Sequence, residues 1–242
     1  MMKESLKKVL LILGGFLFNN RKSKVLYYHD VHGDKKYTSM STDIDLFKNH
    51  ISQIKKNGYS IVKEISNNRN EVLICFDDGF RGVYENRDFF IKNKIYATIF
   101  LITSCINEKD FLTEKEIIEL KNIGLFKFES HTHTHRNLGE LTEKEIEEEV
   151  VLSKSILEKL LGEKVESLCF PRGVFSEKSI EIAKEKGYKR LYLSIPGEYF
   201  NKNDNKIKLR YFAQETSKKM FPHLLRGGQN IFSKKLYKMH KR

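Results

Sequence analysis

Two adjacent carboxylates follow an apolar segment in the first third of the chain. Residues 72–76 are apolar, as is typical of a buried strand, and Asp77, Asp78 and Gly79 come directly after them. Burying two neighbouring carboxylates is costly unless a cation or a proton compensates them. Because successive side chains of an extended chain point in opposite directions, Asp77 and Asp78 can have different roles. The competing interpretation is a simple Asp-Gly turn.

A histidine cluster follows a second short apolar segment. If the chain is helical there, His131 and His135 lie one turn apart and can bind the same ion; if it is extended, His131, His133 and His135 share a face. A carboxylate and two imidazoles leave coordination positions open for water and substrate, as catalytic metal sites do. A second carboxylate beside such an ion could accept the proton of a water molecule. These residue types together predict hydrolysis of an acyl bond.

Strand-like and helical segments alternate around these two clusters, which predicts a parallel sheet that closes, or nearly closes, into a barrel. An N-cap within Ser41-Thr42-Asp43 and the capping boxes Thr113-x-x-Glu116 and Thr142-x-x-Glu145 mark helix starts. The expected strands are residues 25–30, 59–62, 72–76, 95–101, 125–128, 167–170, 191–193 and 207–212. The polar clusters follow the strands, and carboxyl-terminal strand ends converge on one face of such a barrel.

The net charge of +12 lies at the two ends of the chain. Residues 1–24 carry +5 and residues 217–242 carry +8, which leaves −1 for residues 25–216. A near-neutral body argues against nucleic acid as a partner. The same boundaries divide the chain into a basic, apolar N-terminal segment, a central catalytic domain and a basic amphipathic tail.

Both basic ends also carry apolar residues. Residues 9–18 are apolar except for two glycines, but ten residues are too few to span a bilayer, and no small-x-small cleavage site follows them. Basic amphipathic ends suit an anionic membrane surface; packing on the barrel is the alternative. The three cysteines lack metal-pair spacing and fit a reducing compartment. The expected location is therefore cytoplasmic or at the inner membrane, with export by an uncleaved N-terminal segment as an alternative.

The two polar clusters resemble the motifs of the polysaccharide deacetylases of the NodB-homology, carbohydrate esterase 4 type. The T-F-D-D-G motif of that family is similar to residues 75–79, and its S-H-T-x-x-H motif is intact at residues 130–135. The resemblance covers roughly residues 24–212 and implies a deformed (β/α) barrel that removes N-acetyl groups from sugars. It implies Asp77 as the general base and Asp78, His131 and His135 as ligands of a divalent metal, most often Zn²⁺, with Co²⁺ or Ni²⁺ as alternatives.

Other motifs of the family are altered in this chain. Pro171 and Arg172 lie in a segment similar to the third motif, and the backbone N–H of Arg172 is expected to help bind the oxyanion. The chain has no tryptophan, so the tryptophan motif of the family is missing. The motif that supplies the general acid is not evident; His29, after the first strand, and His223, in the tail, are the candidates.

Two functions are compatible with these residues. The resemblance implies a metal-dependent de-N-acetylase whose substrate is a cell-surface polysaccharide, a lipopolysaccharide or a lipid-linked glycan precursor. The altered motifs leave a second interpretation, in which the chain is a catalytically inactive domain that keeps the barrel and binds a glycan.

Overall fold

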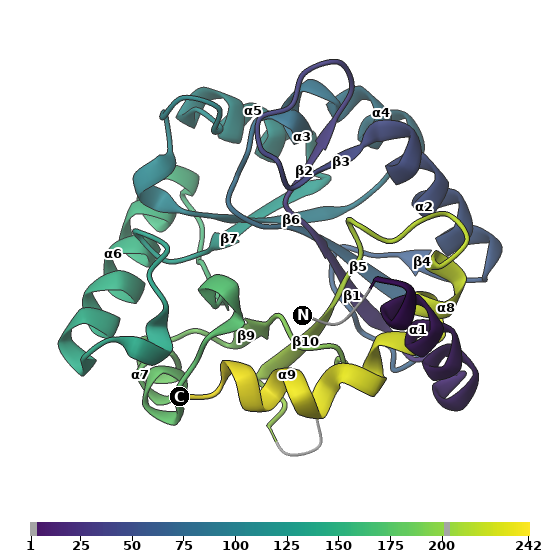
Figure 1. Cartoon of the computed structure of the whole chain (residues 1–242). Helices are drawn as coiled ribbons and strands as arrows, with labels where there is room; N and C mark the ends of the chain where they lie inside the picture. Colours follow the sequence, from purple (N-terminus) through teal and green to yellow (C-terminus); the bar gives the residue numbers. More distant parts are fainter. Residues whose placement is uncertain (1–3, 201–203) are drawn as a thin grey trace.

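The computed structural model describes residues 4–200 and 204–242. Within them, seven parallel strands form a closed barrel in the order β1-β10-β9-β8-β7-β6-β5, and β5 pairs with β1 to close it (Figure 1). The barrel strands are β1 Lys24–Tyr28, β5 Glu71–Phe76, β6 Ala97–Leu101, β7 Phe126–Ser130, β8 Ser167–Cys169, β9 Arg190–Leu193 and β10 Ile207–Phe212. This architecture confirms the predicted deformed (β/α) barrel.

The deformation is located beside β5. One edge of β5 pairs with β1 along residues 72–76. Its other edge pairs first with the short strand β4 (Ser60–Ile61) and only at Cys75 and Phe76 with β6. The strands β5 and β6 therefore diverge below Cys75, and β4 occupies the gap. A separate pair of short strands, β2 (Asp30–His32) and β3 (Ser41–Asp43), follows β1.

Helices surround the barrel, and three of them, α2, α5 and α6, begin where the sequence predicts. The main helices of the central region are α2 Ile44–Lys56, α3 Gly82–Glu85, α4 Arg87–Asn93, α5 Glu114–Ile123, α6 Glu143–Leu161 and α7 Glu177–Glu185. Asp43 caps α2, and both predicted capping boxes are present at α5 and α6. Gly124 and Gly162 end α5 and α6 with left-handed backbone, which glycine adopts at no steric cost.

Two apolar clusters form the core. The larger cluster lies between the strands and the surrounding helices and includes Phe47, Phe76, Phe90 and Leu157. The smaller cluster fills the barrel with inward side chains such as Val25, Cys75, Phe100 and Tyr192. The barrel is thus a packed core, and only its carboxyl-terminal mouth is open for a site.

Both terminal segments are helical and pack beside this mouth. Helix α1 (Glu4–Phe18) packs on α8 (Phe221–Leu225) and on the following turn η4 (Gly228–Phe232), and α9 (Ser233–His240) crosses toward α7 (Figure 1). A Cβ atom on Gly14 would lie 2.2 Å from the carbonyl oxygen of Gly228, so the contact needs glycine there. Residues 1–3 of the predicted N-terminal segment lie outside the described residues. No described helix is long and apolar enough to cross a bilayer.

Candidate active site

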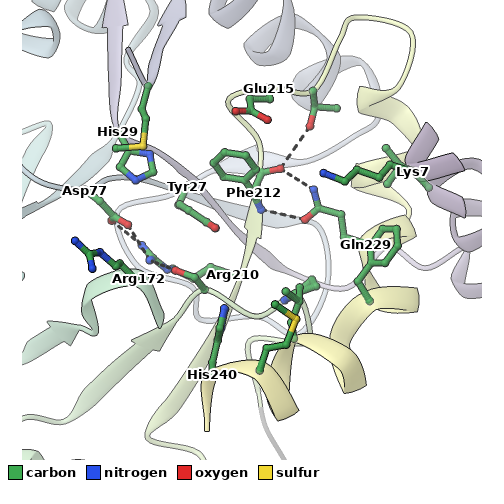
Figure 2. A pocket seen from close by; sticks show the side chains of 18 of the residues that line it. Lys7, Tyr27, His29, Asp77, Arg172, Arg210, Phe212, Glu215, Gln229 and His240 are labelled. Carbon is green, nitrogen blue, oxygen red and sulfur yellow. Dashed lines mark hydrogen bonds and ion pairs between the residues drawn. The ribbon is translucent and has the colours of Figure 1, made fainter. Parts of the chain in front are cut away.

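The predicted site residues come together at the mouth of the barrel. A cavity of about 1430 Å³ is lined by His29, Asp77, Asp78, His131, His135 and Arg172, together with residues of α1, β10 and the C-terminal segment. Figure 2 shows several of these side chains around the cavity. Residues that are far apart in sequence become neighbours because each one follows a strand of the same barrel.

Three of the predicted metal ligands converge on one point. The Oδ1 atom of Asp78 lies 3.4 Å from Nε2 of His131 and 3.5 Å from Nε2 of His135. This oxygen is buried and has no hydrogen-bond partner among the described residues. A buried carboxylate oxygen without a partner is unfavourable unless a cation binds it. The three atoms therefore fit a divalent metal, and all three residues line the cavity.

The backbone between the two histidines is neither a helix nor a strand. Thr132 and His135 have positive φ angles of 69° and 61°, so the chain forms a compact loop that turns both imidazoles toward Asp78. His133 points elsewhere, and its Nδ1 lies 2.9 Å from the Thr103 hydroxyl. The two regular conformations that the sequence suggested for this segment were both wrong, although the choice of His131 and His135 agrees with the observed geometry.

Glu149 of α6 holds this loop in place. Its Oε2 atom accepts hydrogen bonds from the backbone N–H groups of His133 (2.9 Å) and Thr134 (2.8 Å), and its Oε1 accepts one from the Thr134 hydroxyl. Glu149 is 6% exposed, so these bonds compensate a buried carboxylate. Glu149 was not predicted from the sequence, because it lies among several other acidic residues of α6.

Asp77 is bound at two points by Arg210 of β10. Nη1 of Arg210 lies 2.7 Å from Oδ1, and Nη2 lies 2.8 Å from Oδ2. Arg210 also donates to the Ser194 hydroxyl at 3.0 Å and lies over the ring of Tyr27. Burial alone raises the pKa of Asp77, but the Arg210 guanidinium outweighs it and lowers that pKa to about 2. Asp77 therefore remains a carboxylate across the physiological range.

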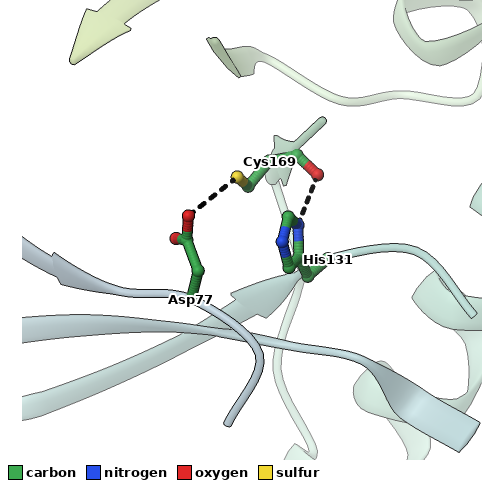
Figure 3. A group of neighbouring side chains, drawn as sticks. All are labelled: Asp77, His131 and Cys169. Carbon is green, nitrogen blue, oxygen red and sulfur yellow. Dashed lines mark hydrogen bonds between the residues drawn. The ribbon is translucent and has the colours of Figure 1, made fainter. Parts of the chain in front are cut away.

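Figure 3 shows a second group, formed by Asp77, His131 and Cys169. It shares His131 with the group of Asp78, His131 and His135, here called the metal triad. The Nδ1 atom of His131 lies 2.8 Å from the carbonyl oxygen of Cys169, so Nδ1 carries the hydrogen and donates it. This tautomer leaves the lone pair of Nε2 directed toward Asp78. The Cys169 thiol lies 3.8 Å from Oδ2 of Asp77. Cys169 thus orients His131, one of the predicted metal ligands, through its backbone carbonyl.

His29 lines the cavity, whereas His223 does not. The Oε1 atom of Gln214 accepts from the backbone N–H of His29 at 3.1 Å and lies 2.7 Å from its Nδ1. Because this oxygen already accepts from a backbone N–H, Nδ1 of His29 must be the second donor, and Nε2 is left for the cavity. His223 instead packs against Gly15 and the ring of Phe16 on α1.

Arg172 also faces the cavity, from the turn η3 (Pro171–Gly173) after β8. Its φ angle of 54° is left-handed, and this conformation aims the residue at the mouth of the barrel (Figure 2). Pro171 begins the turn and is buried. The arginine that binds Asp77 is therefore Arg210, which the sequence analysis did not single out.

The signal for Arg210 was present in the last strand. Ile207, Leu209 and Tyr211 alternate with Lys208 and Arg210, so two cations point to one face of a strand. In a closed barrel one face points inward, and a buried cation there requires an anionic partner. Gln214 follows the same strand, at the end where site residues gather.

The geometry of this site agrees with the family to which the chain belongs. The model of the polysaccharide deacetylase family matches residues 64–191, more than half of the chain. The chain therefore belongs to the polysaccharide deacetylase family. The matched region contains both carboxylates and the histidine cluster, whereas His29 and Arg210 lie outside it.

The individual relatives share a modest fraction of residues with the chain. It is 28% identical over 187 residues to the putative polysaccharide deacetylase YxkH of Bacillus subtilis, which covers 73% of this chain and 66% of the relative. It is 30% identical over 135 residues to a poly-beta-1,6-N-acetyl-D-glucosamine N-deacetylase of Staphylococcus aureus. This match covers 50% of this chain and 47% of the relative. The chain thus spans just under two thirds of the first relative and about half of the second.

Solved structures share the fold. The Streptococcus pyogenes deacetylase PplD, in complex with acetate, superposes with a TM-score of 0.73 at 22% identity and covers 86% of this chain and 98% of its own. IcaB from Ammonifex degensii superposes with a TM-score of 0.77 at 19% identity. The match covers 87% of this chain and 98% of IcaB. At these identities the likeness establishes the barrel fold.

Proposed function

We propose that the chain is a metal-dependent hydrolase that removes N-acetyl groups from an amino sugar of a cell-surface glycan or its lipid-linked precursor. The observation that carries this proposal is the convergence of Asp78, His131 and His135 beside Asp77, a carboxylate that Arg210 keeps ionised. Membership of the polysaccharide deacetylase family supports the reaction class. The Staphylococcus relative, an N-deacetylase of a poly-N-acetylglucosamine, supports an amino-sugar substrate.

The side chains divide the reaction between them. A divalent cation, most often Zn²⁺ in such sites, supplies a Lewis acid that polarises the acetamide carbonyl and makes water easier to deprotonate. Asp77 lines the cavity, its carboxylate is oriented by Arg210, and it accepts the proton of the attacking water. His29, protonated at Nε2 and held through Nδ1 by Gln214, donates a proton to the departing amine. The backbone N–H of Arg172 is available to the oxyanion.

Acetate release from N-acetylated glycans tests this proposal. The zinc-loaded full chain is expected to release acetate, and Asp77→Asn or His131→Ala is expected to lower kcat by at least about a hundredfold. His133→Ala provides the matched control, because this histidine points away from Asp78. Unchanged turnover in Asp77→Asn would contradict the proposal.

The general acid is tested by a second pair of variants. His29→Ala is expected to lower kcat by about a hundredfold, whereas His223→Ala should leave kcat unchanged. Zinc retained at about one equivalent, with glycan binding and no hydrolysis of any glycan, would instead favour the inactive glycan-binding interpretation.

We further infer that the termini bring the enzyme to an anionic membrane surface. On α1, Leu6, Val9, Leu13, Phe16 and Leu17 form one outward stripe that is 48–76% exposed. The opposite face is buried against the C-terminal segment through Gly14 and Gly15. An exposed apolar stripe of this kind, beside two strongly basic ends, is typical of a helix that lies in a bilayer interface.

Vesicle sedimentation tests this inference. The full chain is expected to bind vesicles that contain phosphatidylglycerol more tightly than vesicles of phosphatidylcholine alone. Leu13→Ser/Phe16→Ser should weaken binding to the anionic vesicles, while Val151→Ser/Leu152→Ser, which alters exposed apolar residues of α6, should not. Equal binding by all three proteins would exclude α1 as the contact. Cell fractionation then tests the expected location at the inner membrane.

A further inference from the structure

The cavity continues well beyond the catalytic residues. Its far half is formed by α1 and by the C-terminal segment, two parts of the chain that lie more than two hundred residues apart. Lys7 points into the cavity from α1 toward Gln229, which hydrogen-bonds to Phe212 at the end of β10 (Figure 2). Leu11, Phe232 and Leu236 supply apolar surface beside it.

The charges in this far half are predominantly positive. Lys7, Lys8 and Lys235 line it. Among the described lining residues, Asp77 is paired with Arg210 and Asp78 belongs to the metal triad, which leaves the exposed Glu215 as the opposing carboxylate. Lys7 and Lys235 make no hydrogen bond or ion pair with another described residue, so both ammonium groups remain available to a ligand.

We propose that this far half is a subsite for a phosphate group of the substrate. The proposal rests on the proposed deacetylase function and specifies its substrate: an N-acetylated amino sugar that carries a phosphoester. Lysine binds phosphate as a point charge, and Lys7 of α1 and Lys235 of α9 line the same cavity. The apolar side chains of Leu11, Phe232 and Leu236 would contact a hydrocarbon chain beyond the phosphate. The phosphate can belong to a lipid carrier or to the glycan itself.

Three N-acetylglucosamine substrates of the zinc-loaded full chain test the subsite: one linked to farnesyl diphosphate, one with a 1-phosphate and no lipid, and an uncharged octyl glycoside. The wild type is expected to prefer a phosphate-bearing substrate in kcat/KM. Lys7→Gln/Lys235→Gln should reduce that preference by about tenfold, because two charged contacts are lost. Lys234→Gln/Lys238→Gln removes the same charge from residues of α9 outside the cavity lining and should keep the preference.

The outcomes separate the two sources of phosphate. A loss confined to the farnesyl-linked substrate assigns the subsite to a lipid carrier, and an equal loss with the lipid-free phosphate assigns it to phosphate within the glycan. No preference in the wild type, or an equal loss in the control variant, overturns the subsite while acetate release from the octyl glycoside upholds the deacetylase.

If no substrate releases acetate, the deacetylase proposal fails, and binding decides the subsite separately. Titration with farnesyl diphosphate should then give a salt-dependent Kd that Lys7→Gln/Lys235→Gln raises about tenfold relative to the control. If Lys7→Gln/Lys235→Gln and the control variant have the same Kd, the phosphate subsite is overturned.

Discussion

Asp77 and Arg210 are separated by 133 residues in the chain and form a two-point ion pair inside the barrel, with both N–O distances below 3 Å. Arg210 is fully buried and Asp77 is 3% exposed, so neither charge has water as an alternative partner. The pair joins β5 to β10 across the barrel, with β1 between them. It therefore connects the stability of the barrel with the orientation of the proposed base.

Removing one member of this pair should be more damaging than removing both. Arg210→Met leaves a buried carboxylate without its cation, and we expect a loss of about 3–5 kcal/mol in the free energy of unfolding. Asp77→Asn/Arg210→Met leaves no unpaired charge and should be more stable than Arg210→Met alone. Urea unfolding of Asp77→Asn, Arg210→Met and the double variant measures the difference. Additive losses would contradict the coupling.

The metal triad predicts a selective loss of zinc. His135→Ala removes a ligand, and we expect its zinc affinity to fall by more than a hundredfold, since losing an outer partner alone costs about 10–100-fold. His133→Ala should retain zinc, because His133 binds Thr103 instead. Metal content after dialysis against a graded chelator gives the affinities. Equal zinc loss in His135→Ala and His133→Ala would contradict the assignment of His135, and not His133, as a ligand.

Glu149 predicts an effect on the metal without contact with it. Glu149→Ala removes three hydrogen bonds from the loop between His131 and His135, and we expect a loss of about 10–100-fold in zinc affinity. Glu149→Gln keeps an acceptor oxygen for the two backbone N–H groups, so its loss of zinc affinity should be smaller than that of Glu149→Ala. Glu148→Gln, a change at the exposed neighbour, is the control. A purely structural role would lower the melting temperature without changing zinc affinity in the folded protein.

His50 predicts a loss of stability in mild acid. It is buried and hydrogen-bonded to the Thr216 carbonyl (2.7 Å) and to the Tyr28 hydroxyl (3.1 Å), and burial lowers its pKa from 6.5 to about 4. The unfolded chain binds this proton more readily than the folded chain does. The free energy of unfolding therefore has its full value above pH 6.5 and decreases as the pH falls toward 4. Once the pH is below both pKa values, the free energy of unfolding is lower by about 3 kcal/mol. Urea unfolding between pH 7 and 4.5 should show a flatter pH dependence for His50→Gln than for the wild type.

The close contact between Gly14 and Gly228 predicts that α1 needs glycine at position 14 to stay packed on the C-terminal segment. Gly14→Ala places a Cβ atom against the Gly228 carbonyl, so α1 must move away from the C-terminal segment. We expect faster amide exchange throughout α1, with the barrel strands unaffected. Leu13→Ala, next to it on the outward face, should leave the exchange rates unchanged. Slow exchange in Gly14→Ala would show that the contact can be adjusted.

Local signals predicted much of the fold, because they depend on neighbouring residues. Capping boxes placed α5 and α6, and the alternating pattern of residues 207–212 gave β10 its observed bounds. The motif residues were predicted because their motifs follow strand ends: Asp78 comes after β5, and His131 and His135 come after β7. Gln214 and Glu149 were missed because their roles depend on which strands and helices become neighbours, and no periodicity records that. The alternation of residues 207–211 marked Arg210 as facing one side of β10, but nothing local identified Asp77 as its partner. The left-handed residues Thr132 and His135 likewise depend on the loop as a whole.

The position of β1 in the barrel has a consequence for synthesis on the ribosome. β1 lies between β5 and β10, so one of its neighbours emerges within about fifty residues and the other only after residue 207. A nascent chain that lacks β10 exposes one unpaired edge of β1 and holds Asp77 without Arg210. Unpaired edges are templates for association with other chains. Translation of this protein therefore includes a long interval in which the half-built barrel needs protection from its neighbours.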